Sequence, residues 1–196
     1  LTSVILVVWS IGHGQCAEST ITEMGIAVGG HNVVGQTFEA SCSGYITTIS
    51  IRYTEYPSSN QDIVLRIRDG ENLSSPIIHS QLIQNESINT GINQFNLSEP
   101  IAIEMNELNT IQISDNLASD GSANGVTYLP GESYQNGSAW FGGNQFDQSY
   151  DLAFEVTIES PITGCTDETA CNYNADASED DGSCEYISCI IEGFPC

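Results

Sequence analysis

Apolar and polar residues alternate in short runs through most of the chain, which is the pattern of strands with one buried and one exposed face. The alternation is clearest in two segments: Ile49, Ile51 and Tyr53 face one way and Ser50, Arg52 and Thr54 the other, and Ile63, Leu65 and Ile67 oppose Val64, Arg66 and Arg68. No stretch between Cys16 and Glu159 keeps the apolar period of a helix. We therefore predict strands at Gly25–Val28, Gly35–Ala40, Tyr45–Thr54, Asp62–Arg68, Ile77–Ile83, Asn93–Leu97, Ile101–Met105, Asn109–Ser114, Gly125–Leu129, Ala139–Gly142 and Tyr150–Ile158.

So many short strands predict an all-β fold, a two-sheet, jelly-roll-like sandwich over residues 15–160. A segment of that length buries about two-thirds of the surface of its unfolded chain, so one domain is enough for stability. The order of four features resembles the jelly-roll modules that recur in secreted multidomain proteins. These features are Gly35-Gln36-Thr37-Phe38, Gly44-Tyr45-Ile46-Thr47-Thr48-Ile49, Leu65-Arg66-Ile67-Arg68-Asp69-Gly70 and Tyr150-Asp151-Leu152-Ala153-Phe154.

After a predicted linker at residues 161–164, residues 165–196 are too poor in apolar residues to fold by burial alone. The segment is rich in cysteine and in side-chain oxygens instead, so disulfides and a hard cation such as calcium are the expected stabilisers. Its cysteines are Cys165, Cys171, Cys184, Cys189 and Cys196, and its oxygen donors are Asp167, Glu168, Asn172, Asn174, Asp176, Glu179, Asp180 and Asp181.

This segment closely resembles the acidic Cys-rich repeat found near the C-termini of large secreted or surface proteins of marine bacteria and some algae. The resemblance covers about 26 residues and runs through Gly164-Cys165-Thr166-Asp167, Ala170-Cys171-Asn172-Tyr173-Asn174 and Asp180-Asp181-Gly182-Ser183-Cys184. It implies a secreted or surface location among other modules, and it implies no catalysis.

Disulfides are preferred to a zinc site in this segment, because zinc-binding cysteines usually come as close CxxC pairs and none occurs here. The first four cysteines of the segment, Cys165, Cys171, Cys184 and Cys189, allow three pairings. We expect Cys165–Cys184 and Cys171–Cys189, a staggered arrangement that ties both ends of the acidic loop. Cys16 then pairs with Cys42, and Cys196 is left to pair outside this sequence.

Calcium is the expected cofactor. The predicted side-chain ligands are Asp167, Asn172, Asn174, Asp176, Asp180 and Asp181, with backbone carbonyls completing about 6 to 8 oxygens. A bound cation would relieve the repulsion among the closely spaced carboxylates. The alternative is a solvated acidic surface without a metal.

The net charge of the chain argues against two classes of binding partner. With 26 Asp+Glu against 3 Lys+Arg, the formal net charge is -23, which argues against binding to nucleic acid or to an anionic membrane. Seven cysteines argue for an oxidising compartment. A saline, calcium-containing exterior fits both observations, because ions there screen the self-repulsion of the chain.

Residues 1–14 contain an apolar run, Leu1 to Ile11, of the length of a signal-peptide core, followed by the small residues Gly12 and Gly14. We expect export, with cleavage after Gly14, from a precursor that starts upstream. A buried first strand is the alternative. The run is too short to cross a bilayer of about 30 Å.

No catalytic constellation is evident, so we expect a protein that is not an enzyme. The three histidines, His13, His31 and His79, are scattered, and nucleophile-elbow, zinc-protease and phosphate-binding motifs are missing. The many carboxylates would supply a glycosidase pair by chance and therefore prove nothing.

Two groups of residues are candidates for ligand binding. We expect Arg52, Arg66 and Arg68 to face outward on adjacent strands, where they would form a clamp for a carboxylated or sulfated sugar. Pairing with nearby acids is the simpler interpretation. The aromatic residues Tyr128, Tyr134, Trp140, Phe141 and Tyr150 offer a surface for sugar stacking, with core packing as the alternative.

Four sequons, at Asn72, Asn85, Asn96 and Asn136, would matter only for secretion through a eukaryotic pathway.

Two functions remain for the whole chain. The first is an adhesive or structural module whose partners are a surface glycan or copies of itself. The second is a carbohydrate-binding accessory module of a larger polysaccharide-degrading enzyme.

Overall fold

The computed structural model describes residues 15–21, 26–28, 33–54, 62–115, 125–131, 134–142, 144–145 and 150–186. The predicted signal segment, residues 1–14, lies outside these ranges, as do Cys189 and Cys196. The described part is all-β apart from one 3-10 turn, η1 (Asn85–Ser87). Within it, no helix has the length and apolar character needed to cross a membrane.

The first sheet is antiparallel and has seven strands. Four of them pair in the order β1 (Gln15–Ser19), β13 (Phe154–Glu159), β4 (Gly44–Tyr53) and β7 (Gly91–Ile103). The end of β4 also meets β9 (Val126–Pro130), which pairs with β12 (Tyr150–Leu152) and β2 (Ile26–Val28).

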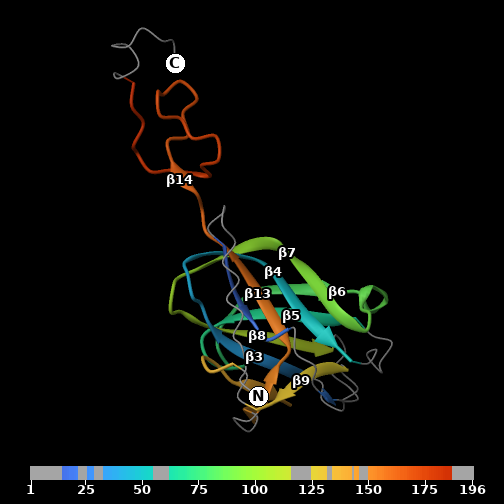
Figure 1. Cartoon of the computed structure of the whole chain (residues 1–196). Coiled ribbons are helices and arrows are strands. Elements are labelled where there is room, and N and C mark those ends of the chain that lie inside the picture. The colour runs from blue at the N-terminus through green and yellow to red at the C-terminus, as the bar shows by residue number, and fades with distance from the viewer. Residues whose placement is uncertain are drawn as a thin grey trace.

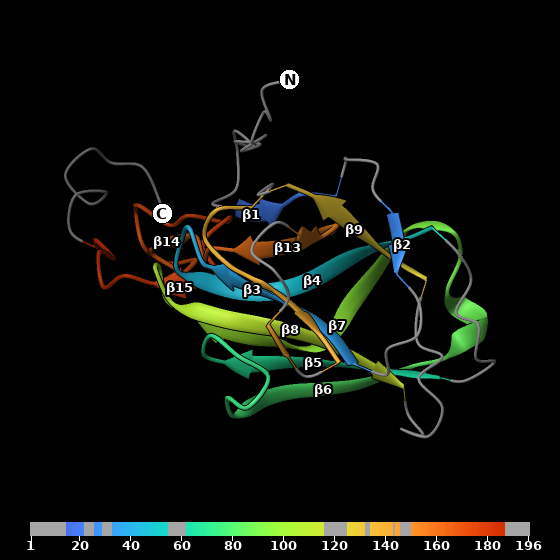
Figure 2. The same cartoon turned by 90° about the horizontal axis from the view of Figure 1, so that it is seen from below.

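The second sheet has six antiparallel strands. Their order is β11 (Asn144–Gln145), β10 (Ala139–Phe141), β3 (Val33–Glu39), β8 (Leu108–Asp115), β5 (Ile63–Asp69) and β6 (Ile77–Ile83). The chain crosses between the sheets from β3 to β4, from β4 to β5, from β6 to β7 and from β7 to β8, so that β1-β13-β4-β7 faces β3-β8-β5-β6. This is the connectivity of a jelly roll, and Figure 2 shows its two layers.

The core lies between the sheets and is built from the alternate residues that the sequence pattern selects. Ile49, Ile51 and Tyr53 of β4 are buried, as are Ile63, Leu65 and Ile67 of β5. Aliphatic side chains of this size each contribute about 1.5–3 kcal/mol when fully buried. The predicted two-sheet sandwich is therefore confirmed at the level of individual strand faces.

Two strand boundaries differ from the prediction. β7 is one long strand where two were expected, and it includes the exposed Pro100. Proline is tolerated there because β7 lies at an edge, where a missing N–H removes no ladder hydrogen bond. The predicted strand Tyr150–Ile158 is divided at Ala153, whose N–H donates to Thr127 O of β9 and whose carbonyl accepts from Arg52 N of β4.

The C-terminal module, residues 161–186, projects from one end of the sandwich (Figure 1). Thr163 and Gly164 were expected in a linker, but they form β14 (Thr163–Gly164), which pairs in parallel with β15 (Glu179–Asp180). Ile162 O also accepts hydrogen bonds from Ser178 N and Glu179 N. The module therefore begins before Cys165, because its backbone pairing needs these residues.

Disulfides hold both parts of the chain. The sandwich contains Cys16–Cys42 and the module contains Cys165–Cys184, the two pairings expected for these cysteines. Cys171 is disulfide-bonded as well, and its predicted partner, Cys189, lies outside the described residues.

Candidate functional site

An open cleft of about 840 Å³ lies beside β3 and β10 on the second sheet. The turn that follows β5 forms one wall, and the segment that precedes β10 forms the other. The lining residues are Thr37, Glu39, Glu71, Asn72, Leu108, Tyr134, Gln135, Asn136, Gly137, Ser138, Trp140 and Gln145. The lining is thus mainly polar and includes two aromatic rings.

Trp140 is a partly exposed aromatic side chain of the cleft, as is Tyr134. Its Nε1 donates to Thr37 Oγ1 at 2.8 Å, and the Thr37 hydroxyl lies 3.0 Å from Glu71 O. Trp140 lies opposite Gly35 in the pairing of β10 with β3. A Cβ at Gly35 would come within 2.5 Å of Ile111 O, so the strand needs glycine at this position. These contacts fix the position of the indole ring.

Tyr134 forms the opposite wall and is held at both of its ends. Its backbone N–H donates to Asp151 Oδ2 at 2.8 Å, and its hydroxyl donates to Glu18 Oε2 at 3.0 Å. The hydroxyl also accepts from Glu39 N at 3.2 Å. Burial, followed by the nearby Glu18 carboxylate, raises the pKa of Tyr134, so the phenol stays protonated as a donor. Its ring meets Phe154 edge-on at 5.3 Å.

A buried polar pair supports this wall from the core. Gln36 Nε2 donates to Asp151 Oδ1 at 3.1 Å, and Gln36 Oε1 accepts from Leu152 N at 2.8 Å. Gln36 belongs to the second sheet and Asp151 to the first, and both are buried. The contacts therefore connect the two layers behind the cleft, and they supply Asp151 with the hydrogen bonds that a buried carboxylate requires.

The floor of the cleft depends on a glycine. A Cβ at Gly137 would come within 1.8 Å of Thr37 O, which leaves no room for a side chain. The neighbouring Ser138 O accepts a hydrogen bond from Thr37 N at 2.9 Å, and Gln145 Nε2 donates to Ser138 Oγ at 2.9 Å. Residues 137 and 138 are thus pressed against β3.

Four polar side chains of the cleft make no hydrogen bond within the described part of the chain: Glu39, Glu71, Gln135 and Asn136. Carboxylates accept hydrogen bonds, whereas side-chain amides both donate and accept them. These four side chains and the indole of Trp140 form a site in which an apolar ring is surrounded by groups that can bind hydroxyls. Glu71, Gln135 and Asn136 lie in loops, and Glu39 ends β3, so none of the four is marked by a periodic pattern. Of the cleft lining, only Trp140 and Tyr134 were predicted from the sequence as ligand-binding residues.

The other aromatic candidates belong to the core. Tyr128 is fully buried, its hydroxyl donates to Trp140 O at 3.1 Å, and burial raises its pKa. It meets Phe141 edge-on at 5.1 Å, and Tyr150 packs against the core. The prediction of Tyr128 as a ligand-binding residue is wrong, because no ligand can reach a side chain between the sheets.

The three arginines do not form one clamp. Arg52 lies on β4 of the first sheet, where its Nε donates to Ile21 O at 3.0 Å. Arg66 and Arg68 lie on β5 of the second sheet. The expectation of adjacent strands was wrong, because the chain crosses to the other layer between β4 and β5. The expected pairing with acids is also not seen within the described residues.

The sequons lie on varied surfaces. Asn136 and Asn96 are exposed, and Asn72 lies beside the cleft with its Oδ1 accepting from Ser74 N at 2.8 Å. Asn85 starts η1 and its N–H donates to Asp62 Oδ1 at 3.0 Å.

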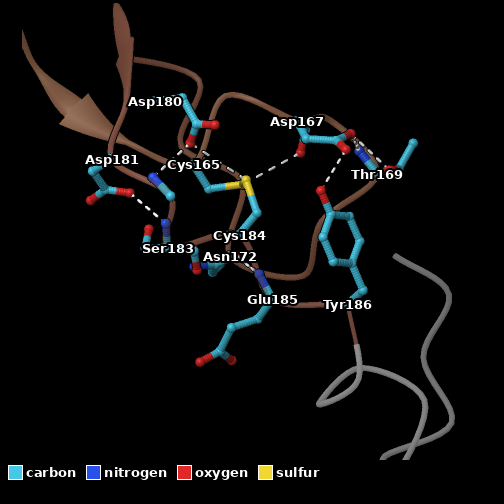
Figure 3. The surroundings of a disulfide bond; sticks show 11 residues. Cys165, Asp167, Thr169, Asn172, Asp180, Asp181, Ser183, Cys184, Glu185 and Tyr186 are labelled. Carbon is cyan, nitrogen blue, oxygen red and sulfur yellow. Dashed lines mark hydrogen bonds between the residues drawn. A yellow bond between two sulfur atoms is a disulfide. The ribbon is translucent and has the colours of Figure 1, made fainter.

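In the C-terminal module, the acidic and amide side chains stabilise tight turns (Figure 3). Four of them accept a hydrogen bond from the backbone N–H two residues later, the geometry of an Asx turn. The pairs are Asp167 with Thr169, Asn174 with Asp176, Asp180 with Gly182 and Asp181 with Ser183, at 2.8, 3.1, 3.1 and 2.8 Å. These local bonds replace the apolar core that the module lacks.

Two longer contacts close the module. Asn172 Nδ2 donates to Ser183 O at 2.7 Å, and its Oδ1 accepts from Glu185 N at 2.8 Å. The Tyr186 hydroxyl donates to Asp167 Oδ2 at 2.7 Å (Figure 3). Hydrogen bonds from Thr169, then from Tyr186, lower the pKa of Asp167, and the bond to Asp167 raises the pKa of Tyr186.

The described residues contain no group of three or more His, Cys, Asp or Glu side chains close enough to hold a metal ion. Of the predicted ligand set, Asp167, Asn172, Asn174, Asp180 and Asp181 accept protein hydrogen bonds. The Asp176 carboxylate makes none within the described part of the chain, and its side chain is exposed. Calcium binding would therefore need these turns to share their oxygens with the ion.

In comparisons with known proteins, no protein-family model matches the chain, and no curated protein matches it.

Proposed function

We propose that this protein is a non-catalytic, secreted or surface-exposed adhesive module whose sandwich binds a glycan in the Trp140 cleft. The observation that carries the proposal is the combination of a fixed, partly exposed indole with Glu39, Glu71, Gln135 and Asn136, whose side chains have no protein partner in the described part of the chain.

A sugar matches this combination of groups better than other classes of ligand do. A pyranose has an apolar face that stacks on a flat ring and hydroxyls at its edge that both donate and accept. Carboxylates and amides are matched to such hydroxyls. The two carboxylates, Glu39 and Glu71, also disfavour an anionic ligand in the cleft, so the proposed glycan is neutral there.

Disulfides and net charge support the proposed location outside the cytosol. The described cysteines are all disulfide-bonded: Cys16 pairs with Cys42, Cys165 pairs with Cys184, and Cys171 is bonded as well. Disulfides persist in oxidising surroundings outside the cytosol. A net charge of -23 is tolerated best where ions screen it. The cleft is lined by two carboxylates, Glu39 and Glu71, and we propose that they bind sugar hydroxyls without turnover.

The test is a glycan array, followed by calorimetry with the glycans that bind. Trp140→Ala should weaken binding at least about tenfold, which corresponds to ~1.4 kcal/mol. Tyr45→Ala, which removes a partly exposed aromatic on the first sheet, is the matched control and should leave glycan affinity unchanged. Equal losses in the two variants, or no glycan bound by the wild type, would refute the cleft as a glycan site.

We further propose that calcium stabilises the C-terminal module through the oxygens of its Asx turns. The exposed carboxylates of the module have no Lys or Arg among residues 161–186 to balance them, so a divalent cation would lower their mutual repulsion. Calorimetric titration of the full chain should detect binding, and Asp176→Asn should weaken it. Glu99→Gln, an exposed carboxylate on β7, removes the same charge and should not.

A second candidate function shares the cleft. As an accessory module of a larger polysaccharide-degrading enzyme, the sandwich would hold the polymer near a catalytic domain. Glycan chemistry in the cleft favours this function equally. The full-length gene distinguishes the two, since a neighbouring catalytic domain would support the accessory module.

A further inference from the structure

Arg66 and Arg68 have no acidic partner among the described residues, in a chain of net charge -23. They lie two residues apart on β5, with their side chains on the outer face of the second sheet. Arg66 Nη1 donates to Ser114 Oγ at 2.6 Å; Arg68 donates to Gln112 Oε1 at 2.7 Å and to Ser75 O. All these acceptors are neutral, so neither guanidinium charge is balanced within the described residues.

The surroundings of Arg66 and Arg68 disfavour the charged form of Arg68. Desolvation, followed by the charge of Arg66, lowers the pKa of Arg68. Two like charges held together on a sheet repel one another and cost stability. A carboxylate placed between them would remove that cost, and a guanidinium offers five N–H donors, more than Arg66 uses here.

Apolar side chains flank the two arginines. In the pairing of β5 with β6, Arg68 lies opposite Ile77, and Val64 lies opposite Leu82. Ile77 is 49% exposed and Leu82 is 52% exposed. β6 is also the edge strand of its sheet. Arginine beside exposed aliphatic residues is the composition of a protein-binding surface more than of a sugar platform.

The C-terminal module carries the complementary features. It contains no Lys or Arg, and the carboxylates of Glu168 and Asp176 are exposed and make no protein hydrogen bond within the described part of the chain. Tyr173 and Tyr186 are 40% and 48% exposed, which provides apolar area beside the acids. The module thus matches the arginine face in both charge and polarity.

One copy does not bring these two surfaces together. The module projects from the end of the sandwich, away from the outer face of β5 and β6 (Figures 1 and 2). Its contact with the sandwich is on the first sheet, where Tyr45 OH donates to Glu179 Oε1 at 3.3 Å. We propose that the face formed by Arg66, Arg68, Ile77 and Leu82 binds the acidic C-terminal module of a second copy.

Such a contact either closes a two-fold dimer, in which each module binds the face of the other copy, or repeats head to tail into rings or filaments. The cleft residue Trp140 lies on β10 and is not part of the proposed face, which consists of residues of β5 and β6. Trp140→Ala should therefore leave self-association unchanged.

Sedimentation velocity of the full chain over a range of concentrations tests the proposal. The wild type should form concentration-dependent oligomers in moderate salt, and Arg66→Glu should weaken association at least about tenfold. Arg52→Glu makes the same change in net charge on the other sheet and should leave association unchanged. Equal weakening by both variants would assign the effect to overall repulsion and overturn the proposal.

A charge exchange gives the decisive result. Glu168→Arg should weaken association alone and restore it in combination with Arg66→Glu, which a folding defect would not do. A wild type that stays monomeric at about 1 mM would overturn the proposal. So would a monomer that binds dextran sulfate through Arg66, because the face would then serve an anionic polysaccharide.

Discussion

The hydroxyl of Tyr134 lies 3.0 Å from Oε2 of Glu18, a residue 116 positions earlier in the chain. Glu18 belongs to β1 and is largely buried, and its other oxygen accepts from Ser41 N at 3.1 Å. One wall of the cleft is thus tied to the first strand of the sandwich.

Tyr134→Phe should lower the free energy of unfolding by about 1–3 kcal/mol, because the Glu18 carboxylate loses a donor in a buried position. Urea denaturation measures the change. Tyr45→Phe removes a hydroxyl that bonds Glu179 at the surface and should stay within about 0.5 kcal/mol of the wild type. A similar loss in both variants would show that the buried bond has no special weight.

Gly137→Ala should disturb the cleft floor, because its Cβ would overlap Thr37 O. We expect glycan affinity to fall at least about tenfold and stability to fall by about 1–3 kcal/mol. Gly137 precedes a segment that makes its own hydrogen bonds to β3, so the crowding cannot be relieved locally. An unaltered variant in calorimetry and in urea would show that the floor can move aside.

Replacing Cys16 and Cys42 together by alanine should lower the free energy of unfolding of the sandwich by about 3 kcal/mol, since the bond closes a 26-residue separation. Scanning calorimetry measures this change. The double substitution of Cys165 and Cys184 is the control, because that bond lies within the module. It should leave the transition of the sandwich where it is.

The bond between Tyr186 and Asp167 should give the module a pH window. The lowered pKa of Asp167 means that its contribution is present above the unfolded value of about 4 and is lost as pH falls through the folded pKa. The raised pKa of Tyr186 means that its contribution is lost as pH rises through that value. In NMR titrations, Tyr186→Phe should raise the Asp167 pKa; an unchanged pKa would contradict the bond.

Much of the fold follows from two-residue periodicity, because strands with one buried face select their own core. Ile63, Leu65 and Ile67 are all buried, as their pattern indicates. Periodicity does not identify a partner strand. Arg52 and Arg66 therefore seemed to be neighbours, although the chain crosses between layers after β4.

The cleft was less predictable, because it depends on contacts between distant segments. Trp140 and Tyr134 stood out as aromatic residues in a polar region. Gln36 and Asp151, which are 115 positions apart, carry no sequence signal of their pairing. The Asx turns of the module explain why its carboxylates recur at short spacing, a pattern that also resembles a metal site.

The position of the Cys16–Cys42 bond has a mechanical consequence. Gln15 lies directly opposite Glu159, so tension that pulls the module away from the sandwich would act first on the β1–β13 hydrogen bonds at this end. That geometry unzips hydrogen bonds one at a time and resists little force. The disulfide begins one residue further on, at Cys16, and carries the load covalently to Cys42, ahead of β4. An adhesive module anchored at one end and bound at the other would thereby keep β1 in place under pulling.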